Sequence, residues 1–185
     1  MKILALSASP NPNGNSAHLV DQLLAAAREA GAQTERVDVN ALRIRGCQAD
    51  YSCKKTGRCF QQDDMQAVYD KIDQADAVVF ASPVYMGDVN GQMKTVLDRL
   101  FQYLNMDLTS RIQPAKRSVF IASQANPDGS LFLDQLKAFP LVLGRLGFGE
   151  PVVLVGPGLG GPDAAAKRPD LADRAREIGR QLARA

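Results

Sequence analysis

Apolar residues along the chain alternate between short continuous runs and helical stripes. The run over residues 2–8 predicts a buried strand, and residues 17–30 have apolar side chains three and four positions apart, which predicts a helix ending at Gly31. The alternation continues to the end of the chain, whereas residues 41–62 show neither pattern and are expected to be irregular. Further strands are expected over 33–39, 75–81, 117–123 and 151–155, and further helices over 63–74, 91–104, 131–146 and 170–185.

Strands that alternate with helices are typical of a parallel sheet covered by helices on both faces. Because crossover connections are right-handed and short, few topologies remain. We expect an α/β fold of the flavodoxin-like type, a three-layer sandwich around a five-stranded parallel sheet in the order 2-1-3-4-5. One domain would span residues 1–185. This order places a ligand crevice at the carboxyl ends of strands 1 and 3.

The composition narrows the classes of function. With 45% apolar residues and a net charge of +2, the chain has no basic field for binding nucleic acid. It contains no apolar run of about 20 residues that would span a bilayer, and its first residues do not resemble a signal peptide. An odd count of three cysteines argues against a disulfide framework. We therefore expect a cytoplasmic protein.

The loop after the first predicted strand has the chemistry of a phosphate site. Residues 9–16 (SPNPNGNS) supply hydroxyls, amides and a glycine and lead into a helix, whose free N–H groups and dipole favour an anion. The loop lacks the lysine of a nucleoside-triphosphate loop. An ordinary polar turn capped by Asn15 or Ser16 is the alternative interpretation. A GxGxxG match at 156–161 is interpreted as a tight loop, because no second strand with a ribose-binding acid can follow it.

Two further loops would face the same crevice. Residues 82–91 (SPVYMGDVNG) offer the ring of Tyr85 and exposed backbone around Gly87, along which a planar heteroaromatic could lie. The alternative is a surface loop with Tyr85 and Met86 folded onto the core. Residues 123–129 begin with uncharged polar side chains.

Three segments together resemble the NADPH-dependent FMN reductase family. They are residues 9–16, 57–65 (GRCFQQDDM) and 82–99 (SPVYMGDVNGQMKTVLDR). Within that family they look like the branch that contains the iron–sulfur flavoproteins. The resemblance covers about residues 1–125, and beyond them it concerns the fold alone. It implies a flavodoxin-like fold, bound flavin mononucleotide (FMN), and a homodimer or homotetramer whose subunit pairing completes the flavin site.

The resemblance also assigns cofactor contacts. Asn11 stands where relatives often carry arginine, so a lower phosphate affinity is expected here. The phosphate-binding positions are Ser9, Asn11, Asn15 and Ser16. The positions along the isoalloxazine ring are Pro83, Val84, Tyr85, Met86 and Gly87, and Ser123 lies near a third flavin contact.

The iron–sulfur branch binds a [4Fe–4S] cluster through CxxCxxC and a fourth cysteine. The corresponding residues here are Cys47, Asp50, Cys53 and Cys59. Because carboxylate is a harder and poorer partner for cluster iron than thiolate, we expect no stable cluster. A packed loop with leftover thiols is favoured, and a redox or other metal role is the alternative. Zinc would lack a fourth soft ligand, since His18 lies far off on the first helix, where we expect a surface residue.

These features predict an FMN-dependent NAD(P)H oxidoreductase. Hydride would pass from nicotinamide to flavin and on to a quinone, a metal ion, free flavin or a nitro compound. Since the cofactor carries the chemistry, no catalytic side chain is assigned. One alternative is a flavodoxin-like electron carrier, against which the net charge of +2 argues because such carriers usually present an acidic face. Another is an iron–sulfur flavoprotein.

Overall fold

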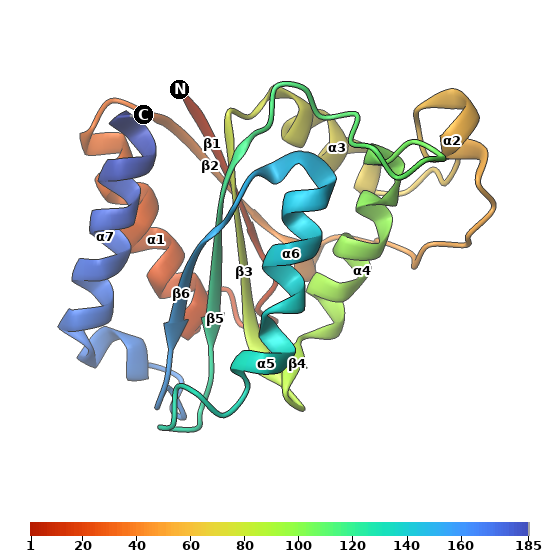
Figure 1. The fold of residues 1–185 in the computed structure, drawn as a ribbon. Coiled ribbons are helices and arrows are strands. Elements are labelled where there is room, and N and C mark those ends of the chain that lie inside the picture. The colour runs from red at the N-terminus through yellow and green to blue at the C-terminus, as the bar shows by residue number, and fades with distance from the viewer. Residues whose placement is uncertain (185) are drawn as a thin grey trace.

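A sheet of five parallel strands forms the middle layer of the protein (Figure 1). The computed structural model describes residues 1–184. The strands are β1 (Lys2–Ser7), β2 (Gln33–Asp38), β3 (Ala77–Tyr85), β5 (Arg117–Ser123) and β6 (Val152–Gly156). Their order, β2-β1-β3-β5-β6, confirms the predicted flavodoxin-like topology. A short sixth strand, β4 (Asp88–Val89), pairs antiparallel with the end of β3 and was not predicted.

Helices cover both faces of the sheet, as the uninterrupted apolar strands require. On one face lie α1 (Asn15–Glu29) and α7 (Pro169–Arg184). On the other lie α3 (Met65–Gln74), α4 (Gly91–Arg99) and α6 (Ala138–Leu143) (Figure 1). Successive residues of β1 point to opposite faces of the sheet. Ile3 packs in the core beneath α1 and α7, and Leu4 packs in the core beneath α3, α4 and α6.

The contact between α1 and α7 depends on a glycine. A Cβ atom built at Gly179 would lie 2.2 Å from the carbonyl oxygen of Leu23 and 3.0 Å from its carbonyl carbon. Only a residue without a side chain therefore allows the two backbones to approach so closely. This contact supports α1, whose first turn belongs to the predicted phosphate loop.

Several element boundaries differ from those expected. The expected helix over 131–146 is instead α5 (Leu133–Leu136), α6 and a π turn, η3 (Gly144–Phe148). Pro140 has no N–H to donate to the carbonyl of Leu136, which separates α5 from α6. Gly147 adopts a φ of +98° inside η3 and ends the helical run.

Other boundaries are set by tertiary contacts. Helix α4 ends at Arg99 and continues only as a 3₁₀ turn, η2 (Leu100–Tyr103), so the predicted end at 104 was too late. Strand β3 begins at Ala77 rather than 75 and extends beyond 81, because its last residues pair with β5 and β4. Short helical turns occur at η1 (Val39–Ala41), α2 (Ser52–Thr56) and η4 (Ala164–Lys167), and α2 lies inside the segment expected to be irregular.

Helix α7 runs to Arg184, and the predicted last position, 185, lies outside the described residues. Across residues 1–184, no helix combines the length and the apolar character needed to cross a membrane.

Candidate functional site

Three polar loops meet at the carboxyl ends of β1, β3 and β5, at the lower edge of the sheet in Figure 1. The N–H of Ala8 donates to the carbonyl of Ala81 over 2.8 Å, which joins the first loop to β3. The hydroxyls of Ser16 and Ser123 lie 2.7 Å apart and are buried, which joins the first loop to the third. Segments far apart in sequence thus meet at the edge of the sheet where the ligand crevice was expected.

The first loop is wound tightly around Asn11. Its carbonyl accepts from the N–H of Gly14 at 3.0 Å, and its Oδ1 accepts from the N–H of Asn13 at 3.0 Å. The N–H of Asn11 donates to Oγ of Ser9 over 3.2 Å. A Cβ atom at Gly14 would meet the Cβ and carbonyl oxygen of Asn11 at 3.2 Å. A side chain at this position would therefore make the loop shift by a few tenths of an ångström.

The first turn of α1 has no side-chain cap. Gly14 occupies the N-cap position, and no side chain caps the helix. The N–H groups of Asn15, Ser16 and Ala17 consequently have no acceptor within the helix. Free N–H groups at the positive end of a helix dipole fit the terminal phosphate of FMN. The alternative that Asn15 or Ser16 caps the helix is wrong.

The side chain of Asn15 has a different set of partners. Its Nδ2 donates to the carbonyls of Leu159 and Gly161 at 3.0 and 2.7 Å, and its Oδ1 accepts from the N–H of Ala165 at 2.8 Å. The amide thus anchors the glycine-rich loop after β6, which is a tight loop as expected. A phosphate contact from Asn15 stays a prediction, and the geometry leaves its backbone N–H to make it.

The second loop forms a hairpin with an exposed tip. Tyr85 pairs with Asp88, and the two residues between them have positive φ angles, +50° at Met86 and +88° at Gly87. Two positive φ angles define the I′ turn that favours hairpins. The Met86 side chain is fully exposed and that of Tyr85 is half exposed, so the alternative in which they fold onto the core is wrong. Pro83 and Val84 are half-buried at the base of the hairpin.

Asn90 joins the first two loops and was missed in the sequence. Its buried Nδ2 donates to the carbonyl of Ala8 over 2.6 Å, and its N–H donates to Oγ of Ser82 over 3.0 Å. Its Oδ1 accepts from the N–H of Met93 at 3.1 Å, which caps α4. An asparagine just before a helix is a cap signal that sequence reasoning can find, whereas the bond to Ala8 is not visible in sequence.

We predict that Asn90→Ser weakens FMN binding roughly twofold to tenfold, the size of one lost hydrogen bond. Serine keeps the helix cap but is too short to reach the Ala8 carbonyl. Asn40→Ser is the matched control, because Asn40 is exposed and bonds only the side chain of Gln92. Fluorescence titration with FMN measures the affinity, and equal values for both variants would contradict the role given to Asn90.

The cysteine loop, residues 46–61, lies at the other end of α4, near α2 in Figure 1. Cys47 is exposed, Cys59 is half-buried, and Cys53 is buried, which raises the pKa of its thiol. The three thiols and Asp50 line one cavity of about 20 Å³, which is room for about one water molecule. Within residues 1–184, no three His, Cys, Asp or Glu side chains are gathered to hold a metal ion.

This donor set does not fit the [4Fe–4S] cluster of the iron–sulfur branch. A hard carboxylate takes the place of one soft thiolate, so this loop does not offer the four thiolates that normally hold such a cluster. His18 is half-buried on α1 and is not among the residues that line the cavity.

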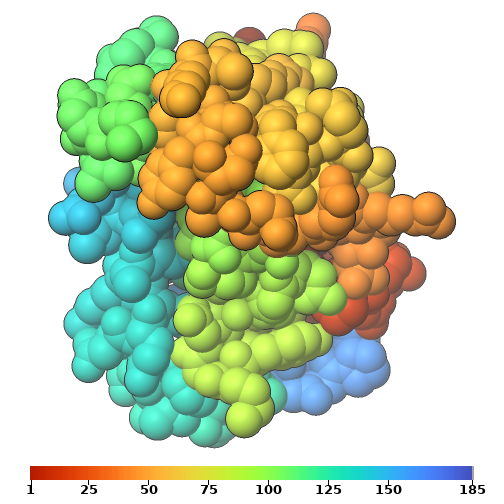
Figure 2. All heavy atoms as spheres, turned by 90° about the vertical axis from the view of Figure 1, so that its right-hand side faces the viewer, coloured from red at the N-terminus to blue at the C-terminus, as the bar shows by residue number. Residues whose placement is uncertain are grey.

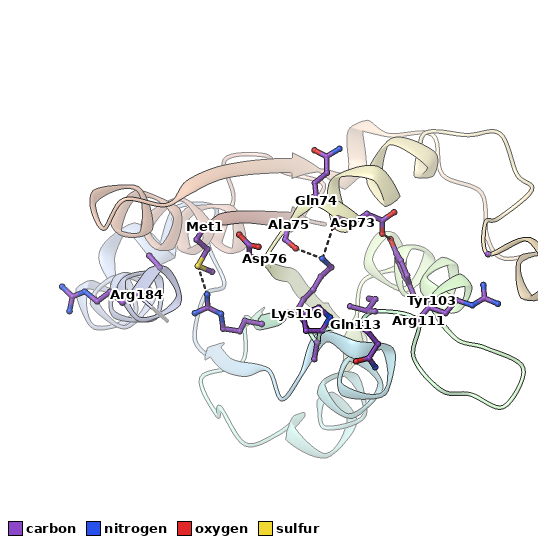
Figure 3. Close-up of a pocket in the computed structure, with 16 residues that line it drawn as sticks. Met1, Asp73, Gln74, Ala75, Asp76, Tyr103, Arg111, Gln113, Lys116 and Arg184 are labelled. Atoms are coloured by element: carbon purple, nitrogen blue, oxygen red, sulfur yellow. Dashed lines mark hydrogen bonds between the residues drawn. The ribbon is translucent and has the colours of Figure 1, made fainter.

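A larger cavity of about 810 Å³ lies at the opposite edge of the sheet (Figure 3). Residues at the amino ends of strands, such as Met1 and Arg117, line it. Some of its polar groups have internal partners: Lys116 Nζ donates to the carbonyl of Ala75 over 2.6 Å, and Tyr103 donates to Asp73 over 2.7 Å. Since ligands of such sheets bind at the carboxyl ends, the three loops remain the candidate site.

Comparison with known proteins identifies the family of the chain. The family model of NADPH-dependent FMN reductases matches residues 1–141. An iron-sulfur flavoprotein of Methanocaldococcus jannaschii is 29% identical over 99% of this chain and 96% of its own length. An iron-sulfur flavoprotein of Archaeoglobus fulgidus is 35% identical, but the aligned part is 56% of this chain and 47% of that relative.

Two solved structures share the fold. An NAD(P)H:quinone oxidoreductase from Methanothermobacter marburgensis superposes with a TM-score of 0.80 at 21% identity, covering 100% of this chain and 98% of the other. An FMN-dependent NADH-azoreductase from Bacillus anthracis, solved in complex with FMN, gives a TM-score of 0.75 at 13% identity, covering 99% and 100%. Since the family model matches well over half of the residues, this chain belongs to the NADPH-dependent FMN reductase family.

Proposed function

We propose that the protein binds FMN across the three loops and catalyses the oxidation of NAD(P)H. The uncapped first turn of α1 is the observation that carries the proposal. It lies beside an exposed hairpin, and Asn90 holds the two at a fixed separation. One phosphate site next to one open edge for a planar ring suits a mononucleotide better than a dinucleotide.

FMN held there would supply the chemistry of hydride acceptance from reduced nicotinamide and of electron transfer to an acceptor. The chain binds and orients the cofactor for this step. The N–H groups at the start of α1 hold the phosphate, and Ser9, Ser16 and Ser123 lie beside them as hydroxyl partners. At the hairpin tip, the N–H groups of Met86 and Gly87 would stabilise negative charge on the polar edge of the ring.

The surroundings of the hairpin favour a planar apolar acceptor such as a quinone. Tyr85 is 50% exposed and Met86 is fully exposed, and the ring of Phe132 lies 3.4 Å from where a Cβ of Gly87 would stand. Free flavin, nitro compounds and metal ions are the other acceptors we consider. We propose that a second subunit covers part of this edge in a homodimer or homotetramer. The three free thiols fit a reducing compartment such as the cytoplasm.

The protein is expected to release FMN on heating and to turn over NAD(P)H with a quinone. Chromatography of the released ligand identifies the flavin, and absorbance at the nicotinamide band follows steady-state oxidation. A flavodoxin-like carrier would be reduced without turnover. FAD in place of FMN, or equal affinity for riboflavin, would contradict the single-phosphate site.

The second candidate function is that of an iron–sulfur flavoprotein, because relatives with that name align with this chain. Broad absorption beside the flavin bands, together with iron and sulfide in the anaerobically purified protein, would favour it. The structure of the cysteine loop allows a more direct test between the two candidate functions.

A further inference from the structure

The cysteine loop is bound to the rest of the chain at its start, its middle and its end by side chains. We propose that Lys54, Arg99 and Arg111 act together as a cation clamp that organises this loop in place of an iron–sulfur cluster. The loop then folds in iron-free protein. Figure 2 shows the loop, in orange, packed beside the green segment around residue 105, to which two of these cations connect it.

Arg111 holds the middle of the loop. Its NH1 donates to the carbonyl of Cys53 over 2.7 Å, and its NH2 donates to the carbonyl of Lys54 over 2.8 Å. The same guanidinium donates to the carbonyl of Gln102 at 3.2 Å and to Oδ1 of Asn105 at 2.7 Å. A planar fork of five N–H donors is suited to several carbonyls at once. Arg111 therefore ties the short helix α2 to η2 and to the segment that follows η2.

Lys54 makes the reverse connection, from the loop to η2. Its ammonium donates to the carbonyls of Phe101 and Leu104, the second at 2.8 Å. It also lies 3.3 Å from the centre of the Phe101 ring, which adds a cation–π contact. The carbonyl of Cys53 and the side chain of the next residue, Lys54, are thus fixed by charge-assisted contacts.

Arg99 fixes the start of the loop. Its side chain is fully buried, pairs with Asp63 at 2.6 Å, and donates to the carbonyl of Arg45 over 2.8 Å. Burial alone would lower the pKa of this guanidinium, but the hydrogen bonds to Asp63 raise it overall, so the charge is permanent.

Two glutamines fix the end of the loop. The N–H of Cys59 donates to the side chain of Gln102 at 2.9 Å, and Gln66 donates to the carbonyl of Cys59 at 2.9 Å.

Metal centres in small loops commonly supply the free energy that folds them. Here the carbonyls of Cys53 and Cys59 already have donors, and the donor to Cys53 is charged, which makes its hydrogen bond one of the stronger kind. The donor set independently lacks a fourth thiolate. If the proposed function holds, electrons then enter and leave through the flavin alone.

Hydrogen exchange of peptides from the cysteine loop tests the clamp. The protein is purified anaerobically, and half is treated with a chelator. We expect iron far below one atom per chain and the same loop protection in both halves. Arg111→Met should raise loop exchange about tenfold or more, because several charge-assisted bonds are lost. Arg145→Met is the matched control, since Arg145 is exposed on η3.

About four irons per chain, with loop protection lost on chelation, would overturn the proposal. Unchanged loop exchange in Arg111→Met would overturn it as well. If that variant does not fold, Lys54→Met provides the same readout. FMN affinity is measured in the same samples and should stay unchanged in Arg111→Met. Failure of the wild type to bind FMN would count against the proposed function and not against the clamp.

Discussion

The Asp50→Cys variant is expected to take up about four irons per chain on anaerobic reconstitution with iron and sulfide, whereas the unmodified protein takes up little. The substitution supplies a fourth thiolate at the spacing of the iron–sulfur branch. Asp50 already lines the same cavity as the three cysteines, so the new sulfur faces the right space. The loop must widen around a cavity of about 20 Å³, and the four iron–thiolate bonds offset that cost.

Iron analysis and the visible spectrum measure this result. Lys55→Cys is the matched control: it adds the same number of thiols, but Lys55 is exposed and does not line the cavity. Equal iron uptake by the two variants would show that a thiol anywhere in the loop suffices. Full iron content in the unmodified protein would instead place the iron–sulfur flavoprotein function first.

The Gly179→Ala variant is expected to lose about 3 kcal/mol of folding free energy, at the upper end for overpacking. The new methyl group would lie 2.2 Å from a backbone oxygen, and a backbone cannot rotate away as a side chain can. Helices α1 and α7 must therefore separate. Because α1 carries the phosphate loop, FMN affinity should fall along with stability.

Urea unfolding of the flavin-free protein measures the loss. Gly91→Ala is the control at another helical glycine, because nothing lies within 4 Å of the Cβ it would add. That variant should unfold at nearly the same urea concentration as the unmodified protein. A Gly179→Ala protein of normal stability would mean that α1 and α7 can separate at little cost.

The sheet could be predicted because inner strands such as β1 and β3 are apolar runs, which must be covered on both faces, and because short right-handed crossovers leave few strand orders. The extension of β3 was not foreseen because it depends on partners from β4 and β5. Helix α2 was missed for a similar reason: five residues are too few to form a helix alone, and Arg111, more than fifty positions away, holds it.

In the candidate site, too, local features could be predicted from the sequence, whereas long-range contacts could not. Sequence located the loops, because polar residues that follow buried strands gather at one edge. It did not separate contacts to a ligand from contacts within the protein. The amide of Asn15 looks like a phosphate ligand in sequence, but its partners lie around Leu159 and Ala165. Asn90 looks like a simple cap, and its bond to Ala8 spans 82 positions.

The two ends of helix α4 lie at different regions of the protein, the predicted flavin loops and the cysteine loop. Asn90 at its start touches the flavin loops, and the cysteine loop is tied to η2 just beyond its end. Nine helical residues span about 14 Å. Cys47 is the exposed thiol, while burial raises the pKa of Cys53 and slows its reaction. A dye attached at Cys47 would therefore sit within energy-transfer range of the flavin without touching it, and its quenching would report cofactor arrival in real time.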